Sequence, residues 1–161
     1  MTIEALDESD KAAISLWNYQ EVHSGFNYAI RKGGWIDSYC HAEDSCCFVA
    51  KNEDVIIGLF FFITSRSNEF RILINPDFLN KGYGKELTKK ALDIGFEQLN
   101  LKEISLIVRK NHTIALSLYQ KMGFMTTGET VETIEGQEME FLIMIKYNPS
   151  QQGKQTECYI K

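Results

Sequence analysis

This chain has 161 residues. The residues best suited to chemistry lie where an apolar strand pattern meets a helix pattern. They form the stretch Leu73 to Lys85, LINPDFLNKGYGK. Gly82 and Gly84 let backbone N–H groups approach a ligand closely, and the following helix N-terminus adds unpaired N–H donors and a positive dipole end. Such a loop is suited to hold phosphate, with Lys81 and Lys85 as nearby charges. The alternative is an ordinary strand-to-helix turn with solvated lysines.

Two common nucleotide motifs do not fit this loop. A Walker loop needs a Ser or Thr after its Gly-Lys pair, but Glu86 follows Lys85. A dinucleotide fingerprint needs a third glycine at the G-x-G-x-x-G spacing, but Leu87 stands there. The loop therefore indicates neither a P-loop NTPase nor a Rossmann enzyme.

A second motif follows downstream, and the two together resemble the GNAT superfamily of N-acetyltransferases. The family's [QR]-x-x-G-x-[GA] turn corresponds to residues 79–84, LNKGYG. Its A-[IL]-x-L-Y-x-x-x-G-F helix end corresponds to residues 115–124, ALSLYQKMGF. Leu79 departs from the usual Gln or Arg, which removes one side-chain contact to pyrophosphate but leaves the glycine backbone.

The resemblance implies acetyl-CoA as the acyl donor, entering an opening between strands at Glu69 to Asn75 and Ile104 to Val108. A main-chain N–H near Leu73 would polarise the thioester carbonyl. The family's customary Asn falls at His112, with Asn111 one residue earlier; Asn111 has the alternative role of capping the helix. The cofactor-binding residues implied are Ile72, Leu73, Ile74, Asn80, Lys81, Gly82, Tyr83, Gly84, Lys85 and either Asn111 or His112.

The mechanism that the resemblance implies is direct attack of a neutral amine on the thioester. Tyr119 is the implied general acid, because a phenol stays protonated at neutral pH and can donate to the departing thiolate. Glu69 is the candidate base, with Glu138 and Glu140 as competitors. The alternatives are a core aromatic for Tyr119 and a solvated strand-end acid for Glu69.

Acceptor recognition in this fold belongs to the early helices and late strands. Residues Phe26 to Tyr39 supply aromatic walls, and a group of acids could bind a cation. The alternative is an aromatic core with solvated acidic loops. The acids are Glu43, Asp44, Glu132 and Glu135.

The elements that must position these residues predict an α/β fold, a mixed sheet with helices on both faces. The resemblance implies the GNAT acyl-CoA N-acyltransferase fold, with a central mixed sheet of six to seven strands flanked by about four helices. The run Val55 to Ile63 is too continuous for a half-exposed strand and is predicted to lie centrally. Asp7 is expected to cap a first helix, with Asp10 completing a capping box. A late helix over 113–122 is predicted with Ile114, Ala115, Leu118 and Met122 inward. Residues 1–147 are expected to form one domain, and residues 148–161 a polar tail.

Composition excludes several classes of protein. The net charge of −5 argues against a nucleic-acid module and favours cationic partners. The four cysteines form no C-x-x-C pair, so reduced thiols are expected and no metal site. With acids in the first ten residues and no run long enough to cross a bilayer, we expect a cytoplasmic protein without membrane contact, either a monomer or a homodimer.

The sequence thus predicts an acetyl-CoA-dependent N-acetyltransferase acting on a small-molecule amine or a protein N-terminus. The competing hypothesis is a catalytically silent acyl-CoA-binding sensor or interaction subunit. Steady CoA release with an amine distinguishes the enzyme from tight binding without turnover.

Overall fold

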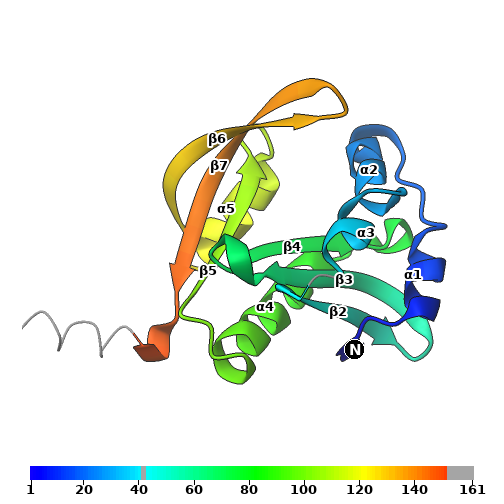
Figure 1. Cartoon of the computed structure of the whole chain (residues 1–161), viewed down its shortest axis with the longest axis horizontal. Helices are drawn as coiled ribbons and strands as arrows, with labels where there is room; N and C mark the ends of the chain where they lie inside the picture. The colour runs from blue at the N-terminus through cyan, green and yellow to red at the C-terminus, as the bar shows by residue number, and fades with distance from the viewer. Residues whose placement is uncertain (41–42, 152–161) are drawn as a thin grey trace, which may run out of the picture. The chain divides into compact units, whose positions relative to one another are not determined.

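The computed structural model describes residues 1–40 and 43–151. Its strands form a seven-stranded mixed sheet in the order β1-β2-β3-β4-β5-β7-β6 (Figure 1). The strands are β1 (Thr2–Ala5), β2 (Ser45–Asn52), β3 (Val55–Ile63), β4 (Glu69–Ile74), β5 (Glu103–Arg109), β6 (Met125–Ile134) and β7 (Gln137–Tyr147). The α-helices are α1 (Glu8–Ile14), α2 (Asn27–Ile30), α3 (Trp35–Tyr39), α4 (Tyr83–Asp93) and α5 (Thr113–Lys121). Short turns are η1 (Glu21–Phe26), η2 (Thr64–Arg66), η3 (Pro76–Phe78) and the π-helical η4 (Ile94–Gln98). The predicted fold class is confirmed.

The chain divides into two compact units. The first unit consists of Met1–Ser65 with Phe70–Thr88, and the second of Arg66–Glu69 with Lys89–Lys161, as far as the structure describes it. β4 and α4 each contribute residues to both units, and the two units are described separately below.

The core of the first unit lies between its strands and its early helices. Every residue of β3 from Ile56 to Ile63 is buried, and β3 lies between β2 and β4, which confirms the predicted central position. Strands β1, β2 and β3 pair antiparallel. One cluster gathers residues from α1, α2, α3 and the strands: Ile14, Tyr19, Ala29, Ile36, Val49, Ile56, Leu59, Phe61, Ile63 and Leu73. The aromatic segment before β2 forms η1, α2 and α3.

The opposite face of these strands carries a row of phenylalanine rings, Phe48, Phe60, Phe62 and Phe70, with neighbouring centroids 5.1 to 6.3 Å apart. Leu87 of α4 approaches β3 at Gly58, where an added Cβ would lie 3.0 Å from Leu87 Cδ2 and 2.7 Å from the Leu73 carbonyl oxygen. Only glycine allows so close an approach without displacing the backbone. Helices therefore cover both faces of this part of the sheet.

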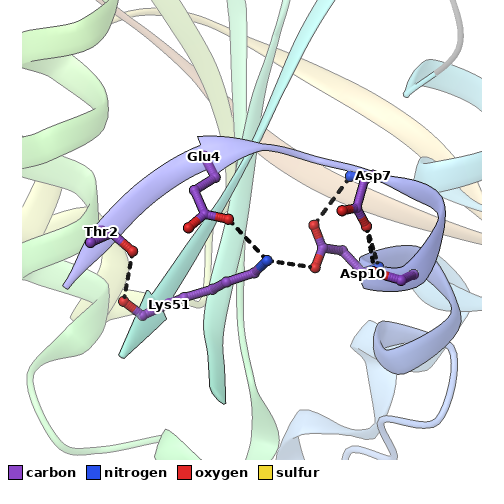
Figure 2. Close-up of polar contacts among 6 residues, drawn as sticks. Thr2, Glu4, Asp7, Asp10 and Lys51 are labelled. Atoms are coloured by element: carbon purple, nitrogen blue, oxygen red, sulfur yellow. Dashed lines mark hydrogen bonds and ion pairs between the residues drawn. The ribbon is translucent and has the colours of Figure 1, made fainter. Parts of the chain in front are cut away.

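The start of α1 is fixed by the predicted capping box. The Asp7 carboxylate accepts the Asp10 N–H at 2.8 Å, and the Asp10 carboxylate accepts the Asp7 N–H at 3.1 Å. Asp10 is only 4% exposed and also contacts Lys51 Nζ at 2.9 Å, while Glu4 contacts the same ammonium at 3.0 Å (Figure 2). The pKa of Lys51 is raised by hydrogen bonds to Asp10 and Glu4. This network ties β1, α1 and β2 together.

We expect Asp10→Asn to lower Tm by about 2 to 6 °C, because it removes a buried charge partner of Lys51 while the amide oxygen can still accept the Asp7 N–H. The matched control is Glu8→Gln, which breaks the Lys11 ion pair at 3.0 Å where Glu8 is 83% exposed, and it should leave Tm within about 1 °C. Thermal unfolding followed by circular dichroism measures both. Equal Tm values for the two variants contradict a structural role for the Asp10–Lys51 pair.

The second unit pairs β7 antiparallel with both β5 and β6. The helix that follows the glycine loop continues through α4 into η4, where the Leu99 N–H bonds the Ile94 carbonyl at 2.9 Å. α5 ends before Gly123, whose φ of 94° suits a glycine after a helix end. The expectation that Ile114 points inward is wrong, since its side chain is 80% exposed. Ala115, Leu118 and Met122 are half-buried.

Asn148 begins the segment expected to be a polar tail, yet it is 2% exposed. Its side-chain amide donates to the carbonyls of Phe96 (3.2 Å) and Leu101 (2.9 Å), and its N–H donates to the Lys102 carbonyl at 2.9 Å. Folded structure therefore continues past residue 147. Residues 152–161, including Cys158, lie outside the described residues.

The three described cysteines, Cys40, Cys46 and Cys47, are free thiols. A hydrogen bond between Cys40 and Cys47 lowers the pKa of Cys47 and raises that of Cys40. Within residues 1–40 and 43–151, no group of three or more His, Cys, Asp or Glu is arranged to hold a metal ion. None of the helices in these ranges is long and apolar enough to span a membrane.

Candidate active site

In the first unit, the loop expected to hold phosphate begins with a fixed turn. The Asn75 side chain accepts the Asp77 N–H at 3.0 Å, and Pro76 stands at the first position of η3. Asn80 and Gly82 then take positive φ values of 60° and 84°. Asn tolerates this left-handed conformation and Gly adopts it freely. The loop therefore reaches α4 by a path that most residues adopt only with strain.

The N-terminus of α4 presents its first backbone N–H groups outward. The first intrahelical bond runs from the Glu86 N–H to the Gly82 carbonyl at 3.2 Å. The preceding N–H groups, of Tyr83, Gly84 and Lys85, have no intrahelical acceptor. A Cβ added at Gly82 or Gly84 would meet no atom within 4 Å. The arrangement fits an anion such as a pyrophosphate.

The two lysines of the loop differ. Lys81 folds back on the loop: its Nζ donates to the Asp77 carbonyl at 3.1 Å and lies 5.3 Å from the centre of the Phe78 ring. Tyr83 packs edge-on against the same ring at 5.7 Å. Lys85 is exposed within the first turn of α4. Lys85 is thus the less restrained cation at this helix end.

The β4 residues expected to hold the cofactor arm, Ile72, Leu73 and Ile74, run directly into this turn. Leu73 is 3% exposed, whereas Ile72 and Ile74 are half-buried. The structure therefore brings β4 from Phe70 onward, the turn and the glycine loop into one unit. The other predicted site residues, Glu69, Asn111, His112 and Tyr119, belong to the second unit.

Glu69 lies at the first position of β4, opposite Ser105 in a parallel pair. Asn68 beside it donates its side-chain amide to the Glu103 carbonyl at 2.9 Å. The competing bases differ in surroundings: Glu140 lies 3.9 Å from Lys110 Nζ, and Glu138 is exposed near the β6–β7 turn. Glu69 is the one of these three that is partly buried.

The residues before α5 were predicted as cofactor contacts. His112 is the N-cap and makes no side-chain capping bond, so the alternative that Asn111 caps this helix is wrong. Asn111 is exposed and His112 half-buried. The choice between them as cofactor contacts stays a prediction.

Tyr119 lies in the last part of α5 and is half-buried. Its ring packs against Phe124 at 5.8 Å with planes tilted by 67°, and its carbonyl accepts the Phe124 N–H at 3.0 Å. Burial raises the pKa of Tyr119 from 10.0 to about 12. The phenol therefore stays protonated across the neutral range, as a general acid must.

This pKa gives a pH prediction. A general acid is active when protonated, so a raised pKa moves the alkaline loss of activity upward. We expect kcat to show no alkaline fall up to about pH 10.5, while acceptor deprotonation increases the rate up to about pH 10. A kcat–pH profile from about pH 6 to about pH 10.5 measures this, with circular dichroism confirming the fold. A fall in kcat centred near pH 9 contradicts Tyr119 as the acid.

The aromatic segment expected to line the acceptor site already contacts a cation. The Arg71 guanidinium lies 4.9 Å from the ring centres of both Trp35 and Tyr39. Trp35 also meets Phe61 edge-on at 6.0 Å. Of the predicted acids, Asp44 accepts a hydrogen bond from the Ser65 hydroxyl, while Glu43, Glu132 and Glu135 are exposed. These aromatics pack against the core cluster of the first unit, as the alternative interpretation held.

Comparison with known proteins identifies the family. The acetyltransferase (GNAT) family model matches residues 8–124, and the chain belongs to this family. The predicted family is thereby confirmed. GNAT acetyltransferases use acetyl-CoA as the acyl donor. The site residues stay predictions.

The relatives include spermidine acetyltransferases from bacteria. Spermidine N(1)-acetyltransferase of Escherichia coli K12 is 29% identical over 124 residues, which cover 74% of this chain and 65% of that protein. The Vibrio cholerae enzyme of the same name is 42% identical over 67 residues, covering 42% of this chain and 39% of that one. The chain thus spans less than two thirds of these curated relatives.

Solved structures of spermidine N-acetyltransferases are also similar to this chain. Spermidine N-acetyltransferase from Vibrio cholerae in complex with CoA and spermine has a TM-score of 0.74 and 26% identity, covering 91% of this chain and 95% of that chain. A chimera of the Vibrio cholerae enzyme reaches a TM-score of 0.76 over 93% of this chain. These findings support acetyl-CoA-dependent transfer to an amine.

Two residues of this region were not singled out from the sequence. Asn75 had a signal, because an Asn directly before a Pro favours a turn start. Tyr19 had none: its hydroxyl bonds the Ile74 carbonyl, 55 positions away in the chain. Only the folded chain brings this pair together.

Proposed function

We propose that this protein is an acetyl-CoA-dependent N-acetyltransferase whose acceptor is a primary amine of an aliphatic polyamine. The observation that carries the proposal is family membership, together with spermidine acetyltransferase relatives that match up to 74% of the chain. The net charge of −5 supports a polycationic acceptor.

The proposed roles follow the sequence predictions. The N–H groups at the start of α4 bind the pyrophosphate, and Lys85 adds charge. The β4 backbone over Ile72, Leu73 and Ile74 holds the pantetheine arm and polarises the thioester carbonyl through those of its groups that face away from β3. Tyr119 protonates the leaving thiolate, and Glu69 removes a proton from the amine. Asn80, Lys81, Gly82 and Tyr83 shape the loop, and Asn111 or His112 makes a further contact.

In the transfer, the neutral amine attacks the thioester carbon and forms a C–N bond. The tetrahedral intermediate collapses with cleavage of the C–S bond, and CoA leaves as a thiol after receiving a proton from Tyr119. The amine proton goes to Glu69, directly or through water. The products are the N-acetylated amine and CoA as a thiol. Solvent then returns a proton to Tyr119 and removes one from Glu69, which restores the enzyme.

The remaining expectations are part of this proposal. We propose a single acetyltransferase domain in a cytoplasmic protein that is a monomer or a homodimer. A protein N-terminus is the alternative acceptor, and a silent acyl-CoA-binding subunit is the alternative class. Neither alternative has specific support from the two cations that make local contacts. Lys81 folds back on the loop, and Arg71 contacts the aromatic rings.

The test measures CoA release from acetyl-CoA with a panel of spermidine, spermine, diamines, amino acids and peptides, with products identified by mass spectrometry. Turnover with polyamines well above that with peptides supports the proposal. Preferred turnover with peptides contradicts the acceptor class. Tight acetyl-CoA binding without turnover on any acceptor favours the silent subunit.

A further inference from the structure

A buried tyrosine in the first unit reaches the end of the strand that leads into the glycine loop. Tyr19 lies between α1 and η1 and is 2% exposed. Its hydroxyl donates to the Ile74 carbonyl at 2.6 Å. Burial raises the pKa of this phenol, so the hydroxyl remains a donor at all ordinary pH values. The contact is a short, partly buried hydrogen bond.

The side of β4 on which this bond lies follows from backbone geometry. Asn75 N–H donates to the Ile57 carbonyl of β3 at 2.8 Å. The peptide between Ile74 and Asn75 is trans, because the described chain has no cis bond, so the Ile74 carbonyl points the opposite way from the Asn75 N–H. The Ile74 carbonyl therefore faces away from β3.

The neighbouring residue points the other way. The Leu73 carbonyl oxygen lies on the β3 side, 2.7 Å from a Cβ built on Gly58. The N–H of Ile74, in the same peptide as that carbonyl, therefore faces away from β3. A ligand that adds to β4 like a strand must use the groups on the side that β3 does not occupy. Ile74 supplies both an N–H and a carbonyl to that side.

We propose that Tyr19 is a positioning residue for acyl-CoA, which holds the Ile74 carbonyl and so fixes the end of β4 with the Ile74 N–H directed to the cofactor side. This inference rests on the proposed function. The peptide between Ile74 and Asn75 is held at both ends, by Tyr19 at its carbonyl and by Ile57 at its N–H. Its plane therefore cannot rotate without losing one of these two hydrogen bonds.

Tyr19 is itself held, and its effect continues into the loop. The Tyr19 N–H donates to Asn27 Oδ1 at 2.7 Å, and Asn27 Nδ2 donates to the Tyr19 carbonyl at 3.0 Å. Beyond Ile74, the Asn75 side chain donates to the Ile56 carbonyl at 2.8 Å and accepts the Asp77 N–H that opens the turn. The hydrogen bonds thus run from Asn27 through Tyr19 to the turn before Gly82.

The test is Tyr19→Phe, which keeps the ring packed against Phe26 at 5.7 Å and removes only the hydroxyl. We expect the Kd for acetyl-CoA, measured by isothermal titration calorimetry, to rise about fivefold to tenfold, the KM for acetyl-CoA to rise with it, and kcat and the acceptor KM to stay within about twofold. Tyr147→Phe makes the same chemical change at a 37% exposed tyrosine and should leave Kd unchanged.

A second variant tests whether Asn27 acts on acetyl-CoA binding through Tyr19. Asn27→Ala loosens the Tyr19 backbone and should raise the same Kd, about threefold. The double variant should show less than the product of the two effects, because Asn27 acts through Tyr19. A lowered Tm with an unchanged Kd in Tyr19→Phe means a structural role only and overturns the positioning role.

The two proposals fail differently. If the wild type binds acetyl-CoA and Tyr19→Phe binds it equally well, the positioning role alone is overturned. If the wild type binds acetyl-CoA without acetylating any amine, the proposed function fails while the Kd comparison still decides the role of Tyr19. A wild type that does not bind acetyl-CoA overturns both.

Discussion

Tyr119→Phe is expected to lower kcat about 100-fold or more while the Kd for acetyl-CoA stays within about twofold. The substitution deletes the only ionisable group of this side chain and keeps the ring contact with Phe124 at 5.8 Å. Without the phenol, the thiolate must leave unprotonated or take a proton from water. Steady-state CoA release at saturating acetyl-CoA and amine measures the loss, and calorimetry measures binding.

A lower kcat with an unchanged Kd distinguishes loss of the general acid from a loss of folding. A protein that only lost packing at α5 would show a lower Tm or a lower fraction of folded protein, both visible by circular dichroism. Tyr147→Phe is the matched control, with the same atom removed from a tyrosine at the end of β7. Unchanged turnover in Tyr119→Phe would show that another group, or water, supplies the proton.

Gly84→Val is expected to raise the Kd for acetyl-CoA about 30-fold or more without lowering Tm. A Cβ at Gly84 meets no protein atom within 4 Å, and no positive φ is required there, so the protein itself tolerates the side chain. Replacing glycine in the first turn of α4 also reduces the freedom of the unfolded chain. The added bulk instead fills the space before the free N–H groups of the helix, which costs about 2 kcal/mol or more of charge-assisted hydrogen bonding.

Calorimetry with acetyl-CoA measures this prediction, and thermal unfolding provides the stability. Gly128→Ala serves as control, because its Cβ meets only Ile143 Cδ1 at 3.8 Å and the residue lies in β6. An unchanged Kd in Gly84→Val contradicts a phosphate site at the α4 N-terminus. A large fall in Tm would instead show that the glycine is needed by the fold.

Most elements were predictable because their signals are local. The continuous apolar run of β3 requires burial on both faces, and it lies centrally. The Asp7 and Asp10 spacing encodes its own capping box, which the structure contains. The glycine after α5 terminates that helix as expected. In each case the signal lies within one short segment of the sequence, even where, as for β3, the partners that bury the segment are distant.

The expectations that failed depended on distant neighbours. The spacing of Ile114 places it on the apolar side of a helix, but no described neighbour buries it. The sequence predicts Asn148 in a polar tail, yet its side-chain amide donates hydrogen bonds to carbonyls 47 and 52 positions away. Polarity alone does not reveal whether a side chain meets water or a buried acceptor.

The sequence by itself determined the family, the order of elements and the glycine loop, because these depend on residue type and short spacing. The tertiary structure decided which way each β4 peptide faces and which group holds it. Ile74 looks like any other strand residue until Tyr19 and Ile57 are in place on either side of its peptide. The Tyr19 hydroxyl and the Ile74 carbonyl are 55 positions apart and meet only when the chain folds, because no local sequence pattern links them.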